Sequence, residues 1–397
     1  MNTAALKHRD FRIYFLGNIF ALNGLWMQRL TVGWLAWDMT RAAGFVGLVA
    51  FLSFAPSMIT GPFFGVLIDR VRVKRAALVT QLAMLALSIL LLTSYLVGGM
   101  SPALLALIAC GHGIVASAHN PVRISLAPRL VPPPVVPSVI ALAAINFNLA
   151  RLTGPALGGW IIARGGVEAT MAVQVACYIP FILTLSLLQP RERVASRAAK
   201  PPFLTALADG FRHAAHSPHI RSALLATGIF AFVIRGALEI LPVVADGVFA
   251  KGPAGLGLLT AAAGAGALVA GLIKALTPAQ APGRLPMWAL GLTLVGMAGV
   301  ALMGLSSNWA LTLMLVAGLG FASSVSGISM QTTVQMDLDD DLRGRVMSLW
   351  AMVGIGAAAA GAGAQGALVD WIGFPATLGL VGVAGVAALS SLMLRLR

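Results

Sequence analysis

The chain has 397 residues, of which 58% are hydrophobic and only 10% are charged, and its mean hydropathy is +0.90. So few polar residues exclude an ordinary soluble enzyme or binding domain. The formal net charge of +14 would suit a nucleic-acid-binding protein, but the basic residues gather between apolar runs, where they contact lipid headgroups. The composition therefore predicts a polytopic membrane protein whose partners include membrane lipids and no nucleic acid.

Apolar runs long enough to cross a bilayer follow one another along the chain. At about 20 residues per crossing, they make about twelve helices joined by short loops. We expect spans near residues 11–37, 43–68, 76–98, 102–126, 138–163, 169–189, 221–248, 254–276, 286–306, 309–332, 343–370 and 374–394. The high content of Gly and Ala suits close helix packing in lipid, so the predicted fold class is an all-α membrane protein.

The basic residues are divided unevenly between the two ends of these spans. Arg41, Arg164 and Lys251 fall in segments on one side, whereas most of the 27 Lys and Arg fall on the other. Cytoplasmic loops carry the excess of Lys and Arg, so we expect both termini in the cytoplasm of a bacterial inner membrane. The first apolar run is too long for the core of a signal peptide and should remain as the first helix.

A basic segment at 191–220 divides the chain into an N-terminal bundle, residues 1–190, and a C-terminal bundle, residues 221–397. Apolar residues of this linker recur at helical spacing from Phe203 to Ala214 and predict a short interfacial helix. Small residues recur at a constant offset between the halves: Gly154, Gly159, Gly166, Ala169 and Thr170 match Gly361, Gly366, Gly373, Ala376 and Thr377. This repeat predicts two pseudo-equivalent bundles with a substrate site between them near the midplane.

The segment from Gly65 to Arg75 reads Gly-Val-Leu-Ile-Asp-Arg-Val-Arg-Val-Lys-Arg. It resembles the loop after helix 2 of the major facilitator superfamily, whose pattern is Gly-x-x-x-Asp-Arg-x-Gly-Arg-Lys. Arg72 stands in place of the usual Gly, and Val73 in place of a usual cation. The resemblance implies the two-bundle fold of that superfamily and a conformational gate in which a carboxylate docks at the start of helix 11. The gate residues would be Gly65, Asp69, Arg70, Lys74, Arg75, Arg343, Gly344 and Arg345.

The predicted fifth helix contains Gly154, Pro155, Gly158 and Gly159 in an arrangement that resembles the Gly-Pro-x-x-Gly-Gly motif of antiporters in this superfamily. Two interpretations stay open: an antiporter helix, or a packing face with no bearing on the direction of transport. Further segments, 33–40, 146–151 and 342–348, resemble the branch that contains enterobactin exporters and macrolide efflux proteins, called transmembrane secretion effectors. The resemblance implies export of a small amphipathic organic molecule.

Several polar residues fall inside predicted spans, where a charged side chain costs about 2.5–3.5 kcal/mol and needs a partner or water. In the superfamily, helices 1, 4, 7 and 10 line the substrate cavity. Candidate cavity residues, largely on those helices, are Asn18, Arg29, His112, His119, Arg123, Arg151, Ser326 and Gln331. For each Arg, bonding to backbone carbonyls and contact with substrate are both open; for each His, we favour a packed neutral imidazole.

Glu239 is an acidic residue at the centre of a predicted span, four residues after Arg235, so one helical turn can pair the two charges. It is either a permanent ion pair that orients the helix or a carboxylate that binds a proton as the cavity opens. Asp38, near the outer end of the first helix, is a second candidate for proton coupling.

The sequence contains no Walker A string, which leaves an ion gradient as the energy source. We expect a monomeric proton antiporter without enzymatic activity, cofactor or metal. The alternatives are an uptake facilitator of a small organic solute and a membrane scaffold or sensor that does not transport.

Overall fold

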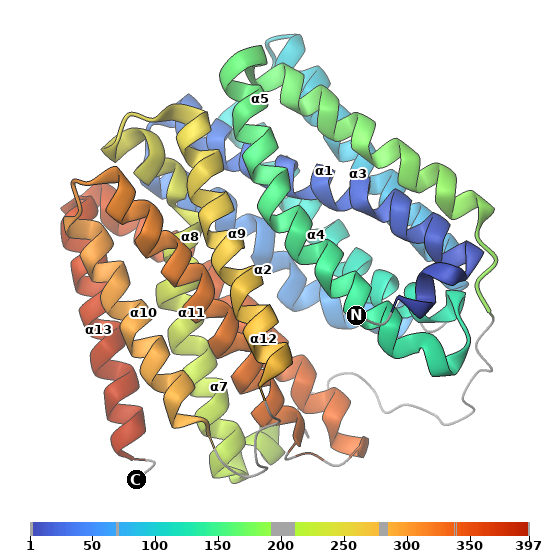
Figure 1. Ribbon diagram of the computed structural model, residues 1–397. Coiled ribbons are helices and arrows are strands. Elements are labelled where there is room, and N and C mark those ends of the chain that lie inside the picture. The colour runs from blue at the N-terminus through green and yellow to red at the C-terminus, as the bar shows by residue number, and fades with distance from the viewer. Residues whose placement is uncertain are drawn as a thin grey trace.

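The computed structural model describes residues 3–68, 71–191, 211–277, 285–336, 338 and 340–395. Within these ranges the chain forms helices and short connections, with no β-strand. Figure 1 shows the helices in two groups, with the early part of the chain in one and the part from α7 onward in the other. We call them the N-terminal and C-terminal groups.

The N-terminal group is formed by helices that are nearly as the apolar pattern predicts. They are α1 (Arg9–Thr40), α2 (Ala43–Ile68), α3 (Val73–Leu96), α4 (Pro102–Leu126) and α5 (Val136–Leu187), with 3-10 turns η1 (Ala4–Lys7), η2 (Ala127–Leu130) and η3 (Pro133–Val135). Inside α5, Gly166 has φ 83° and ψ 171°, a backbone conformation that favours Gly. This bend divides α5 into the two spans predicted at 138–163 and 169–189.

The C-terminal group begins with a helix that is less regular than predicted. In place of one span at 221–248, the chain forms α7 (Pro218–Phe230), the π-helical turn η4 (Ala231–Arg235), α8 (Gly236–Glu239) and a second π-helical turn, η5 (Val243–Val248). Pro242 precedes η5 and has no backbone N–H to continue the helix. The remaining helices are α9 (Gly252–Leu276), α10 (Met287–Leu305), α11 (Trp309–Met336), α12 (Asp340–Ile372) and α13 (Phe374–Leu394).

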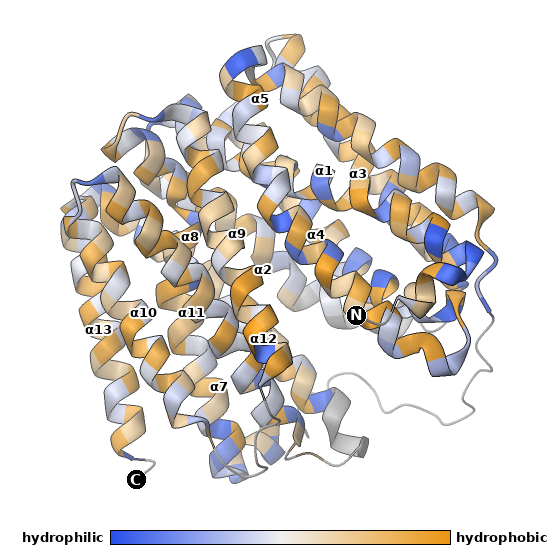
Figure 2. Cartoon of the chain, viewed as in Figure 1, coloured by the Kyte–Doolittle hydropathy of each residue, from blue (hydrophilic) through white to orange (hydrophobic). Residues whose placement is uncertain are grey.

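The surface of these helices is typical of a membrane protein. Nine helices among the described residues are long and apolar enough to cross a membrane, with α5 counted as one in spite of its bend. Figure 2 shows hydrophobic residues along most of the helix shafts and hydrophilic residues mainly near helix ends and connections. The prediction of an all-α membrane protein is therefore confirmed.

The internal repeat is visible in the backbone. Gly166 and Gly373, which the sequence comparison of the two halves matched, have φ 83° and 84° and ψ 171° and 162°. Each lies where the chain turns back between two helices of the same group. The same bend at equivalent positions supports the predicted pseudo-symmetry of two six-helix bundles.

The two ends of the structure are distinguished by their connections. We call the end that carries Gly166 and Gly373 the Gly166 side. The opposite end, the Lys74 side, is where Lys74 bonds to the carbonyl group of Leu188 at the end of α5. Across the two groups, α2 packs against α12 and α5 packs against α9.

The predicted domain boundaries are not tested by the structure and stay a prediction. Residues 192–210 of the linker lie outside the described ranges, as does most of the predicted interfacial helix. Residues 211–216, at the end of that segment, are helical.

Candidate functional site

Four charged side chains lie together midway along the helices, where the two groups meet. This charged cluster consists of Arg29 on α1, Arg151 on α5, and Arg235 and Glu239 on the η4–α8 segment. Nη2 of Arg29 donates to Oε1 of Glu239 over 3.0 Å, so an ion pair joins the two groups. Arg151 and Arg235 interact electrostatically with both members of that pair. Three guanidinium groups therefore share one carboxylate.

The charged cluster is accessible rather than sealed. The side chains of Arg29 and Glu239 are 36% and 28% exposed, Arg151 is half-buried, and Arg235 is exposed. Because both side chains of the ion pair are partly exposed, solvent can reach the carboxylate of Glu239.

Aromatic rings contact two arginines of the cluster, Arg29 and Arg151. The guanidinium carbon of Arg29 lies 4.9 Å from the ring centroid of Trp26 and 4.7 Å from that of Phe54. The guanidinium carbon of Arg151 lies 5.8 Å from the same Trp26 ring. Cation–π contacts of this kind orient a guanidinium without neutralising it, so Arg29 stays available for a carboxylate from the opposite group.

The ion-pair partner of Glu239 differs from the sequence prediction. The pattern within one helix paired Glu239 with Arg235, whereas among the described residues the ion pair is made with Arg29, from the other group. Arg235 remains nearby and interacts electrostatically with Glu239. The prediction was wrong about the partner because spacing along one helix carries no information on which helix packs opposite.

Asp38 belongs to a separate set of contacts on the Gly166 side. Arg41 pairs with Asp38 at 3.0 Å and also with Asp246 of η5. Nε1 of Trp37 donates to Oδ2 of Asp246 over 2.9 Å. The structure therefore places Asp38 in a link between α1 and η5 rather than in the charged cluster around Glu239.

Asp370 makes a second link between the groups on the Gly166 side, and the sequence did not single it out. Its Oδ1 accepts the backbone N–H of Ala43 at 2.8 Å, and its Oδ2 accepts that of Gly44 at 2.7 Å. The carboxylate at the end of α12 thus caps the start of α2. One signal could have found it: an acidic residue at a helix C-terminus is unfavourable for its own helix, so a partner elsewhere is expected.

The antiporter-like motif of α5 forms close packing on two sides. A Cβ at Gly154 would lie 2.7 Å from Cβ of Trp26 on α1, and one at Gly158 would lie 3.3 Å from Cδ2 of Leu30. A Cβ at Gly159 would lie 2.8 Å from Cα of Gly257 on α9. The glycines thus pack closely, as either interpretation of the motif requires, and Gly159 extends that packing across the two groups. Pro155 lies inside α5, buried between these glycines.

Three of the expected cavity residues lie inside one group instead of between the two. Asn18, on α1 of the N-terminal group, is buried. His119 is also buried in that group, and its Nδ1 atom lies 3.4 Å from the hydroxyl of Thr80 on α3. The hydroxyl of Ser326 lies 2.5 Å from that of Thr293 on α10. His119 and Ser326 therefore contact residues of their own groups in this conformation.

The other expected cavity residues are only partly buried. Arg123 lies 5.3 Å from the Phe147 ring centroid, and Gln331 is half-buried on α11. Both ring nitrogens of His112 are buried without a hydrogen-bond partner among the described residues. The structure brings Arg29 and Arg151, but none of these three, into the charged cluster.

The expected gate falls largely outside the described residues. Asp69 and Arg70 lie outside them, and the side chains of Arg343 and the surroundings of Gly65 and Gly344 are likewise not described. Arg75 is exposed and Arg345 is half-buried. In the conformation described, Nζ of Lys74 donates to the carbonyl groups of Ser186 and Leu188, both at 2.7 Å, within its own group.

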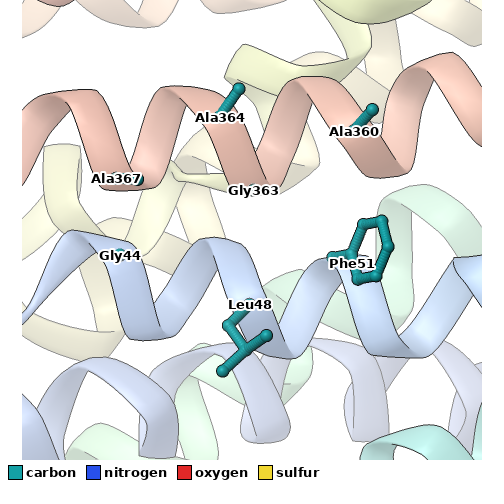
Figure 3. Close-up of a pocket in the computed structure, with 7 residues that line it drawn as sticks. All are labelled: Gly44, Leu48, Phe51, Ala360, Gly363, Ala364 and Ala367. Atoms are coloured by element: carbon teal, nitrogen blue, oxygen red, sulfur yellow. The ribbon is translucent and has the colours of Figure 1, made fainter.

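A small apolar pocket lies between α2 and α12. Its cavity volume is about 400 Å³. Figure 3 shows its lining of small and hydrophobic side chains: Gly44, Leu48, Phe51, Ala360, Gly363, Ala364 and Ala367. Since no polar side chain lines it, the pocket is part of the helix contact and offers no chemistry for recognising a polar ligand.

Comparison with known proteins agrees with this architecture. The family whose model matches residues 2–397 is described as transmembrane secretion effector. The enterobactin exporter EntS of Shigella boydii serotype 4 (strain Sb227) is 27% identical over 384 residues, which cover 93% of this chain and 87% of that protein. EntS of Escherichia coli (strain SMS-3-5 / SECEC) is also 27% identical over 384 residues, with the same coverage of 93% and 87%.

Two solved structures show the same fold at low sequence identity. The nucleoside transporter NupG has a TM-score of 0.71 and 12% identity, covering 98% of this chain and 99% of that chain. A bacterial homolog of the human lysosomal transporter Spinster has a TM-score of 0.69 and 16% identity, covering 97% and 95%. Both likenesses concern the arrangement of helices.

Proposed function

The chain belongs to the transmembrane secretion effector family, and we propose that this membrane transporter exports a small amphipathic organic molecule by proton antiport. The family match along the chain and the likeness to enterobactin exporters support export of a small molecule. The ion pair between Arg29 and Glu239 is the observation that carries the coupling to protons.

The coupling follows from the place of Glu239 in the charged cluster. Protonation removes the negative charge that the three arginines share among the described residues, and the ion pair that joins the two groups is lost with it. Because both partners are about a third exposed, the pair contributes roughly 1 kcal/mol or less. That is enough to shift the balance between two conformations of similar energy.

The second part of the proposal is alternating access by rocking of the two groups. Described residues of the two groups are joined by hydrogen bonds of Asp246 and Asp370 on the Gly166 side and by the Arg29–Glu239 pair midway. These contacts support a conformation that is closed on the Gly166 side. On the Lys74 side, we propose that Asp69 closes the opposite conformation by docking at the start of α12, the helix that corresponds to the eleventh predicted span.

The orientation in the membrane completes the proposal. With both termini in the cytoplasm, the Gly166 side faces outward, and the conformation described receives substrate from the cell. The proton would enter from the outside and leave to the cytoplasm.

Everted membrane vesicles test this function directly. Vesicles that contain the protein are energised to acidify their lumen, and acridine orange reports the pH gradient while a panel of amphipathic compounds is added. At least one compound should release luminal protons from wild-type vesicles and not from Glu239→Gln vesicles. Proton release that is identical in the two, or transport that ignores the pH gradient, would contradict proton antiport.

A further inference from the structure

The η4 turn places the acidic member of the charged cluster. A π-helical turn carries one residue more than an α-helical turn, so it rotates the residues that follow by about 100° relative to a continuous α-helix. Glu239 ends the four-residue helix α8 that directly follows η4. Without the π-helical turn, its carboxylate would be directed away from Arg29.

Gln365 of α12 bonds directly to this turn. Its Nε2 donates to the carbonyl groups of Phe232 and Val233, at 2.7 Å and 3.3 Å, and the side chain is fully buried. Both carbonyl groups lie inside η4, where the regular i to i+4 bonding is interrupted. A donor from another helix satisfies backbone groups that would otherwise be poorly bonded in an apolar environment.

Two glycines allow α12 to come close enough for these bonds. A Cβ at Gly236 would lie 2.5 Å from Nε2 of Gln365 and 2.7 Å from the backbone of Gly361. A Cβ at Gly361 would overlap the Phe232 carbonyl group. The turn, the amide and the two glycines therefore form one fitted contact, which adjoins the charged cluster because Arg235 is the last residue of η4.

From this contact we infer that Gln365 is a positioning residue, which holds η4 in its π-helical form and thereby directs Glu239 at Arg29. Its importance for transport rests on the function proposed above for the Arg29–Glu239 pair. The positioning itself is a statement about geometry and can be tested without a substrate.

Crosslinking rates measure that geometry. In a background in which Cys110 and Cys177 are replaced by Ser, one cysteine pair is placed at positions 29 and 239, and a reference pair at Leu48 and Ala367. A short bismaleimide should join positions 29 and 239 at least fivefold more slowly when Gln365→Met is added, because Met fills the space without a donor. The reference pair, which reports only contact between α2 and α12, should react at an unchanged rate.

Matched variants separate positioning from general destabilisation. Thr377→Val removes the hydrogen bond of another buried side chain of the C-terminal group, to the carbonyl group of Gly373, and should leave both rates unchanged. Gln365→Asn, whose amide is one methylene shorter, should reproduce the selective loss if Gln365→Met fails to fold. An unchanged rate at positions 29 and 239, or an equal loss at both pairs, would overturn the inference.

The vesicle assay then links the positioning to function. Gln365→Met should lower compound-driven proton release, and the double variant with Glu239→Gln should lower it no further than Glu239→Gln alone. Selective loss of crosslinking with normal proton release would refute the coupling role of the pair while leaving the positioning intact.

Discussion

Replacement of Asp370 by Asn should open the Gly166 side. The carboxylate accepts two backbone N–H groups at the start of α2, from Ala43 and Gly44, whereas the Asn amide has one oxygen to offer and no charge. A charge at a helix N-terminus contributes about 0.3–1 kcal/mol, and a hydrogen bond to a charged group contributes about 1.5–3 kcal/mol. Because Asp370 is exposed and water replaces part of the loss, we expect a net effect of about 1–2 kcal/mol, or about a five- to thirtyfold change in the ratio of the two conformations.

Distances between spin labels measure this ratio. Labels at Glu168 and Ser307, exposed positions on the Gly166 side of the two groups, would report separation by double electron–electron resonance in protein without its native cysteines. In Asp370→Asn the longer distance should gain population. Asp10→Asn is a matched control, because Asp10 also accepts a backbone N–H, from Gln189, but within the N-terminal group. A distance distribution that is the same in wild type and Asp370→Asn would refute the role of this cap.

Further predictions concern packing, capping and orientation. Gly159→Val should lengthen the distance between the spin labels and destabilise the closed state by about 1–3 kcal/mol, since a side chain there meets the backbone of α9. Gly271→Ala is the control, because a Cβ at that position meets no atom within 4 Å. Lys74→Met should lower the thermal unfolding temperature, because about 1–2 kcal/mol of bonding to the end of α5 is lost. An unchanged unfolding temperature together with a changed distance between the spin labels of the two groups would contradict this role of Lys74. A membrane-impermeant maleimide should label Arg164→Cys in intact cells but Ala215→Cys only after permeabilisation, and the reverse pattern would refute the orientation.

The helices could be predicted from the sequence because lipid imposes length and composition on each of them. The predicted spans 43–68, 102–126 and 374–394 coincide with α2, α4 and α13. The bend at Gly166 was also anticipated, as the gap between two spans, and its repeat at Gly373 reflects the same turn in the second half. Local composition carries this information because the absence of water in lipid favours regular helices, in which most backbone polar groups bond within their own segment.

The site could be predicted only in part, because its partners come from different helices. The sequence singled out Arg29, Arg151, Arg235 and Glu239, and the structure brings these four together. It could not show that Glu239 pairs across the two groups. The π-helical turn η4 left no periodicity signal, since its extra residue is stabilised by the amide of Gln365 from another helix.

Asp370 and Ser326 show the two opposite errors. Asp370 went unnoticed because its partners are backbone groups of α2, which have no sequence signature. Ser326 is expected to face a cavity because it is polar and lies on a helix that lines the cavity in the superfamily, yet its hydroxyl bonds to Thr293 and to the carbonyl group of Ala322 in its own group. A polar residue in a lipid-spanning helix needs a partner, and the sequence does not say on which side that partner lies.

Transport by purified Glu239→Gln in liposomes tests the central claim most directly. With a compound identified in the vesicle assay, wild-type protein should drive its movement against a gradient when a pH difference is imposed, and should also exchange labelled for unlabelled compound without one. The account predicts that Glu239→Gln folds and retains the exchange but loses the pH-driven movement. Retained pH-driven movement by a folded Glu239→Gln protein would contradict proton coupling through the Arg29–Glu239 pair.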